Sequence, residues 1–265
     1  MKLSIQHSTE YRYSERVKHS TQYLRLTPRP SARQRVLSWQ LDLPEHADEG
    51  SDGYNNILHV LTLDKPHQQI ALTVKGVVEI TDEDGEDCDH RLSPLVFTRH
   101  TFLTECNESL LDLAHRHDGQ EECLRLERLS ESILEGMPVT PGVTSVASNA
   151  REAWKLGKGV CQDHTHVFLA CCRALGMPAR YVSGYLYSKD SEHVASHAWA
   201  EVWQGDSWKT FDVTNQTCQP RHHLKLAVGM DYMDACPVRG VRFGGGVESL
   251  EAVALVNQAA SERMQ

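Results

Sequence analysis

The sequence contains no long hydrophobic run and no excess of basic residues, and each absence excludes a class of protein. None of its apolar stretches, such as residues 167–172, approaches the ~20 residues that a membrane-spanning helix needs. The 27 Lys and Arg residues are outnumbered by 36 Asp and Glu residues, which gives a formal net charge of −9. Nucleic-acid binders usually carry a basic face, and membrane-surface proteins often carry a polybasic segment. We therefore expect no nucleic-acid partner and no membrane partner, and the composition indicates no oligomeric state.

The N-terminus also lacks the apolar stretch of a secretory signal peptide, so we expect a cytoplasmic location. The eight cysteines are an even number, which would permit disulfides. However, a chain of 265 residues buries enough apolar surface to fold without them, and the cytoplasm keeps thiols reduced. The composition therefore predicts free thiols and leaves open whether any of them has a chemical role.

No Cys-x-x-Cys or His-Glu-x-x-His pattern indicates a metal site. His164 and His166 lie two residues apart in a segment with helical periodicity, where their side chains point ~200° apart and do not easily share an ion. The histidine pairs at 115/117 and 222/223 complete no ligand set either. We therefore expect no metal and no other cofactor.

The spacing of the apolar residues divides the chain into two parts. Residues 1–92 contain short runs of β-branched and aromatic residues, such as 70–80, separated by turn signals. Further along, the apolar residues follow helical spacing, most clearly at 123–137. We predict an α+β protein with a β-rich N-terminal domain at 1–92 and a second domain at 93–265. The acidic run at 82–89 is predicted to be a solvated loop at the junction.

Residues 157–178 carry the most informative pattern in the chain. Their apolar residues form one helical stripe that ends at Gly176, and Cys161 falls in the first turn of this helix. The unpaired N–H groups and the dipole of a helix N-terminus favour a thiolate, and the same N–H groups can bind an oxyanion. Cys161 is therefore a candidate nucleophile, with a small buried packing residue as the alternative. Cys171 and Cys172 lie mid-helix and are expected to pack in the core.

A nucleophilic thiol needs a base and a group that orients the base. An alternating strand begins at Ser196, and a Gly-Asp turn signal separates it from a return strand, which predicts a β-hairpin. A loop of two or four residues pairs Trp203 with Trp208. In that register His197 and Asp212 lie on one face as diagonal neighbours, close enough for their side chains to meet, whereas an odd-length loop would separate them.

Four segments of the chain together resemble a known family of proteins. They are Gly-Val-Cys-Gln-Asp at 159–163, Arg-Ala-Leu-Gly-Met-Pro-Ala-Arg-Tyr-Val-Ser-Gly-Tyr-Leu at 173–186, Ser-His-Ala-Trp-Ala-Glu-Val at 196–202 and Trp-Lys-Thr-Phe-Asp-Val-Thr-Asn at 208–215. The chain resembles the transglutaminase-like superfamily, and within it the bacterial proteins that carry a β-rich region ahead of the core. The stretches at 19–29, 52–56 and 223–240 extend the likeness over nearly the whole chain.

This resemblance implies a papain-like core in which helices pack on an antiparallel sheet. It places the nucleophilic cysteine of the family at Cys161, the histidine at His197 and the aspartate at Asp212, in agreement with the roles reached from the residues. The chain departs from the family at His164, where an aromatic or aliphatic residue is usual, and at Val213, where proline is usual. The calcium dependence of the large animal cross-linking enzymes is not expected here, because no calcium loop is present.

The resemblance and the candidate triad together predict an acyl-transfer enzyme. Cys161 would attack the carbonyl of a peptide or protein amide, and water or an amine would then resolve the thioester. The bacterial branch of the family favours water, and therefore a peptidase or amidase rather than a cross-linking enzyme. A non-catalytic peptide-binding module and a metal-dependent hydrolase are the alternatives.

Five further residues are candidates for substrate contacts. The backbone N–H of Gln162 is a candidate oxyanion donor. Asp163 and His164 are expected to line the cleft beside the nucleophile, with a first-turn acid and a surface histidine as the alternative reading. Trp199 either shields the site or packs in the core, with core packing favoured, and Tyr185 is expected at the edge of the cleft.

Overall fold

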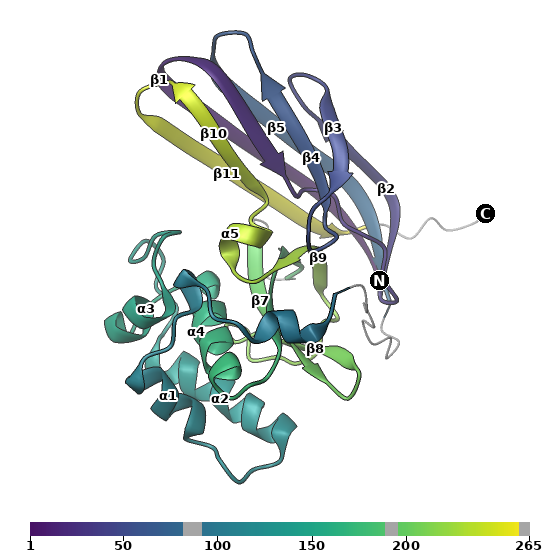
Figure 1. Ribbon diagram of the computed structural model, residues 1–265. Coiled ribbons are helices and arrows are strands. Elements are labelled where there is room, and N and C mark those ends of the chain that lie inside the picture. The colour runs from purple at the N-terminus through teal and green to yellow at the C-terminus, as the bar shows by residue number, and fades with distance from the viewer. Residues whose placement is uncertain (82–91, 189–195, 260–265) are drawn as a thin grey trace, which may run out of the picture.

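The chain folds into two β-sheets and a group of helices (Figure 1). The structure is a computed structural model that describes residues 1–81, 92–188 and 196–259. The predicted acidic loop at 82–89 lies outside the described residues. The larger sheet has seven strands: β1 (Lys2–Leu24), β2 (Gln34–Asp42), β3 (Ala47–Ser51), β4 (Ile57–Leu63), β5 (His67–Ile80), β10 (Val238–Gly244) and β11 (Glu248–Gln258).

Strand β1 pairs with four other strands and changes its buried face along its length. Its odd-numbered residues from Leu3 to Thr9 are buried, whereas Ser20 and Leu24 are buried after a register shift between Val17 and His19. A bulge moves the two-residue side-chain period by one position, so that the opposite set of side chains turns inward. The first half of β1 pairs with β5 and β11, and the second half pairs with β4 and β10.

The last two strands return to the sheet in which the chain begins. Strands β10 and β11, drawn in yellow, lie beside the purple β1 in Figure 1 and pair with it antiparallel. The sequence-based boundary at 92/93 assigns them to the second domain, but they complete the first sheet. That residues 1–92 and 93–265 are separate domains stays a prediction.

The helices follow the first five strands and gather at one end of the molecule (Figure 1). They are η1 (Pro94–Thr98), η2 (Phe102–Thr104), α1 (Glu108–His115), α2 (Glu122–Gly136), α3 (Ala150–Leu156) and α4 (Cys161–Ala174), with the short α5 (Tyr232–Ala235) near the end of the chain. The helical spacing at 123–137 is confirmed by α2. Within the described ranges, no helix combines the length and the apolar character needed to cross a bilayer.

The second sheet has four antiparallel strands in the order β8-β7-β6-β9. Their bounds are β6 (Ala179–Leu186), β7 (Ser196–Gln204), β8 (Ser207–Phe211) and β9 (His223–Gly229). Ala198, Ala200 and Val202 of β7 share one apolar core with Val167 and Phe168 of α4. Helix α4 therefore covers one face of this sheet, and the predicted α+β class is confirmed.

The predicted hairpin forms in the expected register. Trp203 pairs with Trp208, and Gly205 and Asp206 form the turn with φ angles of 53° and 68°. Two successive residues with positive φ are typical of the type I′ turn, whose twist matches that of antiparallel strands. This even-numbered loop is what places His197 and Asp212 on the same side of the sheet.

Two amide side chains of the N-terminal domain bind the backbone of β9. Asn56 donates to Val228 O at 2.7 Å and accepts from Val228 N–H at 2.8 Å. Gln34 makes the same pair of bonds with the backbone of Lys225, each at 2.9 Å. The carboxylate of Asp52 orients Asn56 by accepting from its backbone and side-chain N–H groups. These bonds fix the N-terminal sheet against the strand that lies beside β6.

Replacing Asn56 with alanine is expected to lower the free energy of unfolding by about 2–4 kcal/mol, because it leaves a buried N–H and a buried C=O of Val228 without partners. Urea denaturation followed by circular dichroism measures the change. The exposed Gln40 on β2 supplies the control, and Gln40→Ala should change stability by less than about 0.5 kcal/mol. Equal effects of the two substitutions would refute the docking role of Asn56.

Candidate active site

Cys161 is the first residue of α4, in the helix position that the sequence predicts. Asp163 fixes this turn, because its Oδ2 accepts hydrogen bonds from the N–H of Val160 and from the hydroxyl of Thr144, both at 2.8 Å. The Cys161 side chain is half-buried. The N–H groups of this first turn, including that of Gln162, have no acceptor within the helix. They are therefore free to receive negative charge that develops beside the thiol.

The structure brings Cys161, His197 and Asp212 together. His197 lies at the start of β7, and its Nε2–H donates to Asp212 Oδ2 at 2.7 Å. The Cys161 side chain interacts with the same imidazole and helps to raise its pKa. The Asp212 side chain has no exposed surface, and that of His197 is 10% exposed. The imidazole is thus held between a buried carboxylate and a thiol.

The surroundings of His197 and Asp212 favour the charged form of each side chain. Burial disfavours the charged form of His197, but its hydrogen bond to the Asp212 carboxylate and its interaction with Cys161 outweigh burial and raise the pKa of His197 to about 10. Burial likewise opposes ionisation of Asp212. Hydrogen bonds from His197 and His223 and the charges of both imidazoles nevertheless hold the pKa of this carboxyl below its usual range. At neutral pH the site therefore contains an imidazolium bonded to a carboxylate.

Two residues that the sequence analysis did not assign complete the network around Asp212. His223, at the start of β9, donates from Nε2 to Asp212 Oδ2 at 2.8 Å. Asn215 donates to Oδ2 from its side chain at 2.8 Å and to Oδ1 from its backbone N–H at 3.2 Å. Burial lowers the pKa of His223 despite the carboxylate beside it. The carboxylate that orients His197 is itself held by donors from two further segments.

Replacing His223 with leucine is expected to raise the pKa of Asp212, because one of the donors that stabilise the carboxylate is lost. A carboxyl with a lowered pKa is ionised above that pKa and protonated as the pH falls through it. The acid limb of Cys161 alkylation by iodoacetamide should therefore move to higher pH. His223→Gln, which keeps an N–H donor, should restore most of the wild-type profile. An unchanged acid limb in the leucine variant would exclude this positioning role.

His197, Asp212 and His223 are also the group of described residues whose ligand atoms could hold a metal, since these atoms lie within 4.8 Å of one another. Two imidazole nitrogens and one carboxylate oxygen are ligands that zinc accepts. In the present geometry, however, both Nε2 atoms carry protons and donate them to Asp212. A metal at this position would take the place of those protons.

Of the three predicted cleft residues next to Cys161, two are buried. Asp163 is 1% exposed and caps its own helix, and His164 has no exposed surface. His164 donates from Nε2 to Met137 O at 2.7 Å and accepts from the Thr214 hydroxyl at 2.9 Å. It therefore ties α4 to the segment that follows Asp212, which positions the nucleophile relative to the carboxylate. These placements give Asp163 and His164 no surface for a substrate, and the role of Gln162 as a substrate contact stays a prediction.

The other two predicted substrate contacts are also buried. Trp199 is 2% exposed and stacks beside His197, with ring centroids 6.0 Å apart. Tyr185 has no exposed surface, and its hydroxyl is hydrogen-bonded to His7 of β1 at 2.6 Å. Tyr185 thus belongs to the contact between the two sheets, because β6 runs on beyond the site toward β1. Its placement does not support the predicted position at the edge of the cleft.

The remaining cysteines differ from Cys161. All seven cysteines among the described residues are free thiols, and Cys88 lies outside those residues. Burial raises the pKa of the Cys171 and Cys172 thiols well above the usual value, and burial together with the nearby Glu127 carboxylate raises that of Cys218 to about 12. The prediction that Cys171 and Cys172 pack in the core is confirmed.

A cysteine at the N-terminus of a helix, facing a histidine and an aspartate on an antiparallel sheet, defines a cysteine-protease-like fold. The chain belongs to the transglutaminase-like superfamily. The family description "Bacterial transglutaminase-like N-terminal region" matches residues 3–79, and "Transglutaminase-like superfamily" matches residues 113–213.

Related proteins match nearly the whole length of the chain. The uncharacterized protein Rv2569c of Mycobacterium tuberculosis is 30% identical over 93% of this chain and 89% of its own length. The uncharacterized Mycobacterium leprae protein ML0607 is 28% identical over 98% and 99%. A crystal structure from Cytophaga hutchinsonii, which carries a provisional cysteine-protease name, has a TM-score of 0.80 and 21% identity, covering 100% of this chain and 92% of that one. At this identity the structural likeness shows the fold alone.

Proposed function

We propose that this protein is a thiol-dependent hydrolase of peptide or carboxamide bonds, in which Cys161 is the nucleophile, His197 the acid and base, and Asp212 the group that orients the imidazole. The observation that carries the proposal is the hydrogen bond of 2.7 Å between His197 Nε2 and the buried Asp212 Oδ2, with Cys161 at the start of α4 interacting with the same imidazole. The raised pKa of His197 supports an imidazolium that can act as the acid of the reaction.

In the acylation step, the Cys161 thiolate attacks the amide carbonyl carbon and a C–S bond forms. The negative charge that develops on the carbonyl oxygen lies near the first-turn N–H groups of α4, among them that of Gln162. The imidazolium of His197 then donates its proton to the amide nitrogen, the C–N bond breaks, and the amine leaves. The products of this step are a thioester on Cys161 and a neutral His197.

In the deacylation step, neutral His197 accepts a proton from water while the water oxygen attacks the thioester carbonyl carbon. The C–S bond breaks, the carboxylic acid leaves, and the thiolate and imidazolium are restored. An amine that takes the place of water would give a new amide, and the same groups would then catalyse transfer. The likeness of this chain to the bacterial branch of the superfamily favours water.

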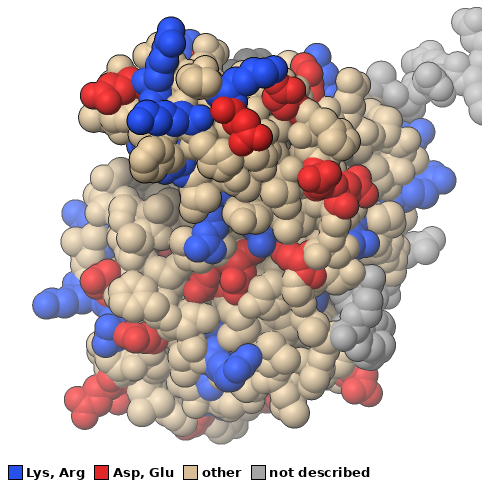
Figure 2. All heavy atoms as spheres, turned by 45° about the horizontal axis from the view of Figure 1, so that its top comes forward, with Lys and Arg blue, Asp and Glu red and all other residues tan. Residues whose placement is uncertain are grey.

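The proposed substrate is a peptide or protein amide, and the proposed location is the cytoplasm, where a reducing environment keeps Cys161 as a thiol. Nucleic acid is not a proposed partner. Figure 2 shows acidic and basic side chains interspersed over one face of the molecule rather than gathered into a basic stripe. The net charge of −9 is consistent with this proposal.

The test is capture of the acyl-enzyme. The protein is mixed with a library of N-acetyl peptide aminocoumarin amides, quenched in acid and analysed by intact-mass and peptide mass spectrometry, with and without a primary amine such as putrescine. We expect the acyl group on Cys161 and release of the free acid.

Each other result selects a different function. Formation of the putrescine amide in place of the free acid would indicate that the enzyme transfers the acyl group to an amine rather than to water. Peptides that bind without acylating Cys161 would support a non-catalytic peptide-binding module. Hydrolysis that survives Cys161→Ser but stops on chelation would instead support a metal-dependent hydrolase at the His197, Asp212 and His223 cluster.

A further inference from the structure

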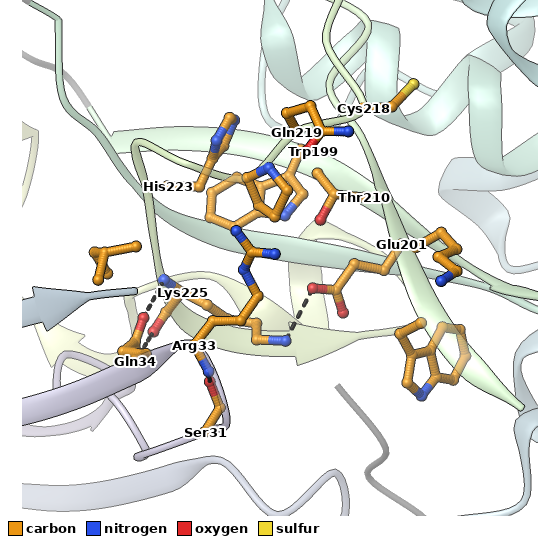
Figure 3. Close-up of a pocket in the computed structure, with 14 residues that line it drawn as sticks. Ser31, Arg33, Gln34, Trp199, Glu201, Thr210, Cys218, Gln219, His223 and Lys225 are labelled. Carbon is orange, nitrogen blue, oxygen red and sulfur yellow. Dashed lines mark hydrogen bonds and ion pairs between the residues drawn. The ribbon is translucent and has the colours of Figure 1, made fainter. Parts of the chain in front are cut away.

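A cavity lies on the face of the small sheet that α4 leaves uncovered. Ala200 of β7 packs against α4, so the alternating neighbours Trp199 and Glu201 face the opposite side. Together with residues 31–34 of the N-terminal domain they line a cavity of about 330 Å³ (Figure 3). His223 also lines it, so one imidazole separates the cavity from the carboxylate of the candidate triad.

Three N–H donors of the cavity-lining residues have no hydrogen-bond partner among the residues that the structure describes. They are Nε of Arg33, Nε1 of Trp199 and Nε1 of Trp208. The two tryptophans are 2% and 5% exposed, so their N–H groups are cut off from bulk water. Buried donors without acceptors cost free energy, and native proteins rarely leave several of them at one place. An occupant with acceptor atoms would satisfy them.

Arg33 brings a positive charge to this cavity that the carboxylate of Glu201 does not neutralise. The carboxylate of Glu201 is already paired with Arg180 at 2.6 Å and with Lys225 at 2.9 Å. Figure 3 shows the Arg33 side chain extending from its loop toward Trp199, beside the pair of Lys225 and Glu201. In the part of the chain that the structure describes, no carboxylate forms an ion pair with Arg33. A guanidinium in this position selects for an anionic group.

The rest of the lining is suited to an apolar body. The indole rings of Trp199 and Trp208, with Ile80 and Pro220, contribute apolar surface. We infer that this cavity binds a small organic carboxylate, whose carboxylate accepts from Arg33 and whose apolar body lies against the two indoles. The inference concerns binding alone and requires no reaction at Cys161, although Trp199 also stacks beside His197 and His223 also reaches Asp212.

The test uses the full-length protein, labelled with ¹⁵N, and benzoate as the probe. The five tryptophans give five indole N–H resonances, which single Trp→Phe variants assign. Benzoate should shift the resonances of Trp199 and Trp208 in a saturable manner and leave that of Trp39, which donates to Leu26 O, in place. Arg33→Gln should weaken binding about tenfold. The matched control is Arg35→Gln, which removes an exposed arginine paired with Glu79 and should leave the affinity unchanged.

Benzyl alcohol, which has the same ring without the charge, is the second comparison and needs no variant. We expect it to bind at least ~10-fold more weakly than benzoate. The absence of a saturable shift with benzoate, or equal binding of benzoate and benzyl alcohol, would overturn the inference. So would an affinity for benzoate that Arg33→Gln leaves unaltered.

Discussion

Replacing Cys161 with serine is expected to lower the rate of amide hydrolysis at least ~10³-fold while leaving the fold intact. The hydroxyl is close to the thiol in size, so the contacts of the half-buried side chain are kept. It is much less acidic than a thiol, however, so His197 no longer faces a stable anion. Release of aminocoumarin from the peptide amides measures the rate, and circular dichroism verifies the fold.

The matched control for this substitution is Cys123→Ser. Cys123 is an exposed thiol on α2 with no histidine among its hydrogen-bond partners, so its replacement should leave the rate within about twofold of wild type. Full activity in the Cys161→Ser variant would show that the nucleophile has been assigned to the wrong residue.

Replacing Asp212 with asparagine is expected to slow turnover about 10³-fold. Asparagine presents an amide where His197, His223 and Asn215 all donate to one carboxylate oxygen, and it removes the charge that stabilises the imidazolium. The pKa of His197, raised to about 10 in the wild type, should then fall toward its ordinary value of 6.5. The pH–rate profile of Cys161 alkylation measures this shift.

Asp212→Asn should also change how the free energy of unfolding depends on pH. A histidine whose pKa is raised by folding contributes stability that is complete below pH 6.5 and is lost as the pH rises toward about 10. The free energy of unfolding of the wild type should therefore decline over this range, whereas that of Asp212→Asn should not. Asp206→Asn, in the turn of the same hairpin, is the control and should follow the wild type in both activity and pH dependence. An identical decline in all three proteins would contradict the ion pair.

Local sequence signals were sufficient for the part of the site that two neighbouring elements build. The Gly-Asp turn sets an even loop length, and this alone fixes the register that places His197 beside Asp212. The glycines before Cys161 and the apolar stripe after it locate the start of α4. These signals depend on residues close together in the chain, where backbone geometry leaves few alternatives.

The residues that were missed depend on contacts between distant segments. His223 reaches Asp212 because β9 pairs with β6, and no local pattern reveals that pairing. Its only signal was membership of a histidine pair, which was considered for a metal. Tyr185 seemed to border the cleft because its strand leads to the site, but its partner His7 lies 178 residues away. The return of β10 and β11 to the first sheet is a long-range pairing of the same kind.

The most direct test of the candidate triad is the order in which the thiols of the native protein react. Limiting iodoacetamide at pH 6, followed by peptide mass spectrometry, compares all the cysteines in one sample. We expect Cys161 to be alkylated at least ~10-fold faster than the exposed Cys123, because Cys161 begins α4 and interacts with an imidazole that a buried carboxylate holds. We also expect this preference to disappear in His197→Ala. Equal alkylation of Cys161 and Cys123, or a preference that persists without His197, would contradict an activated thiol at this site.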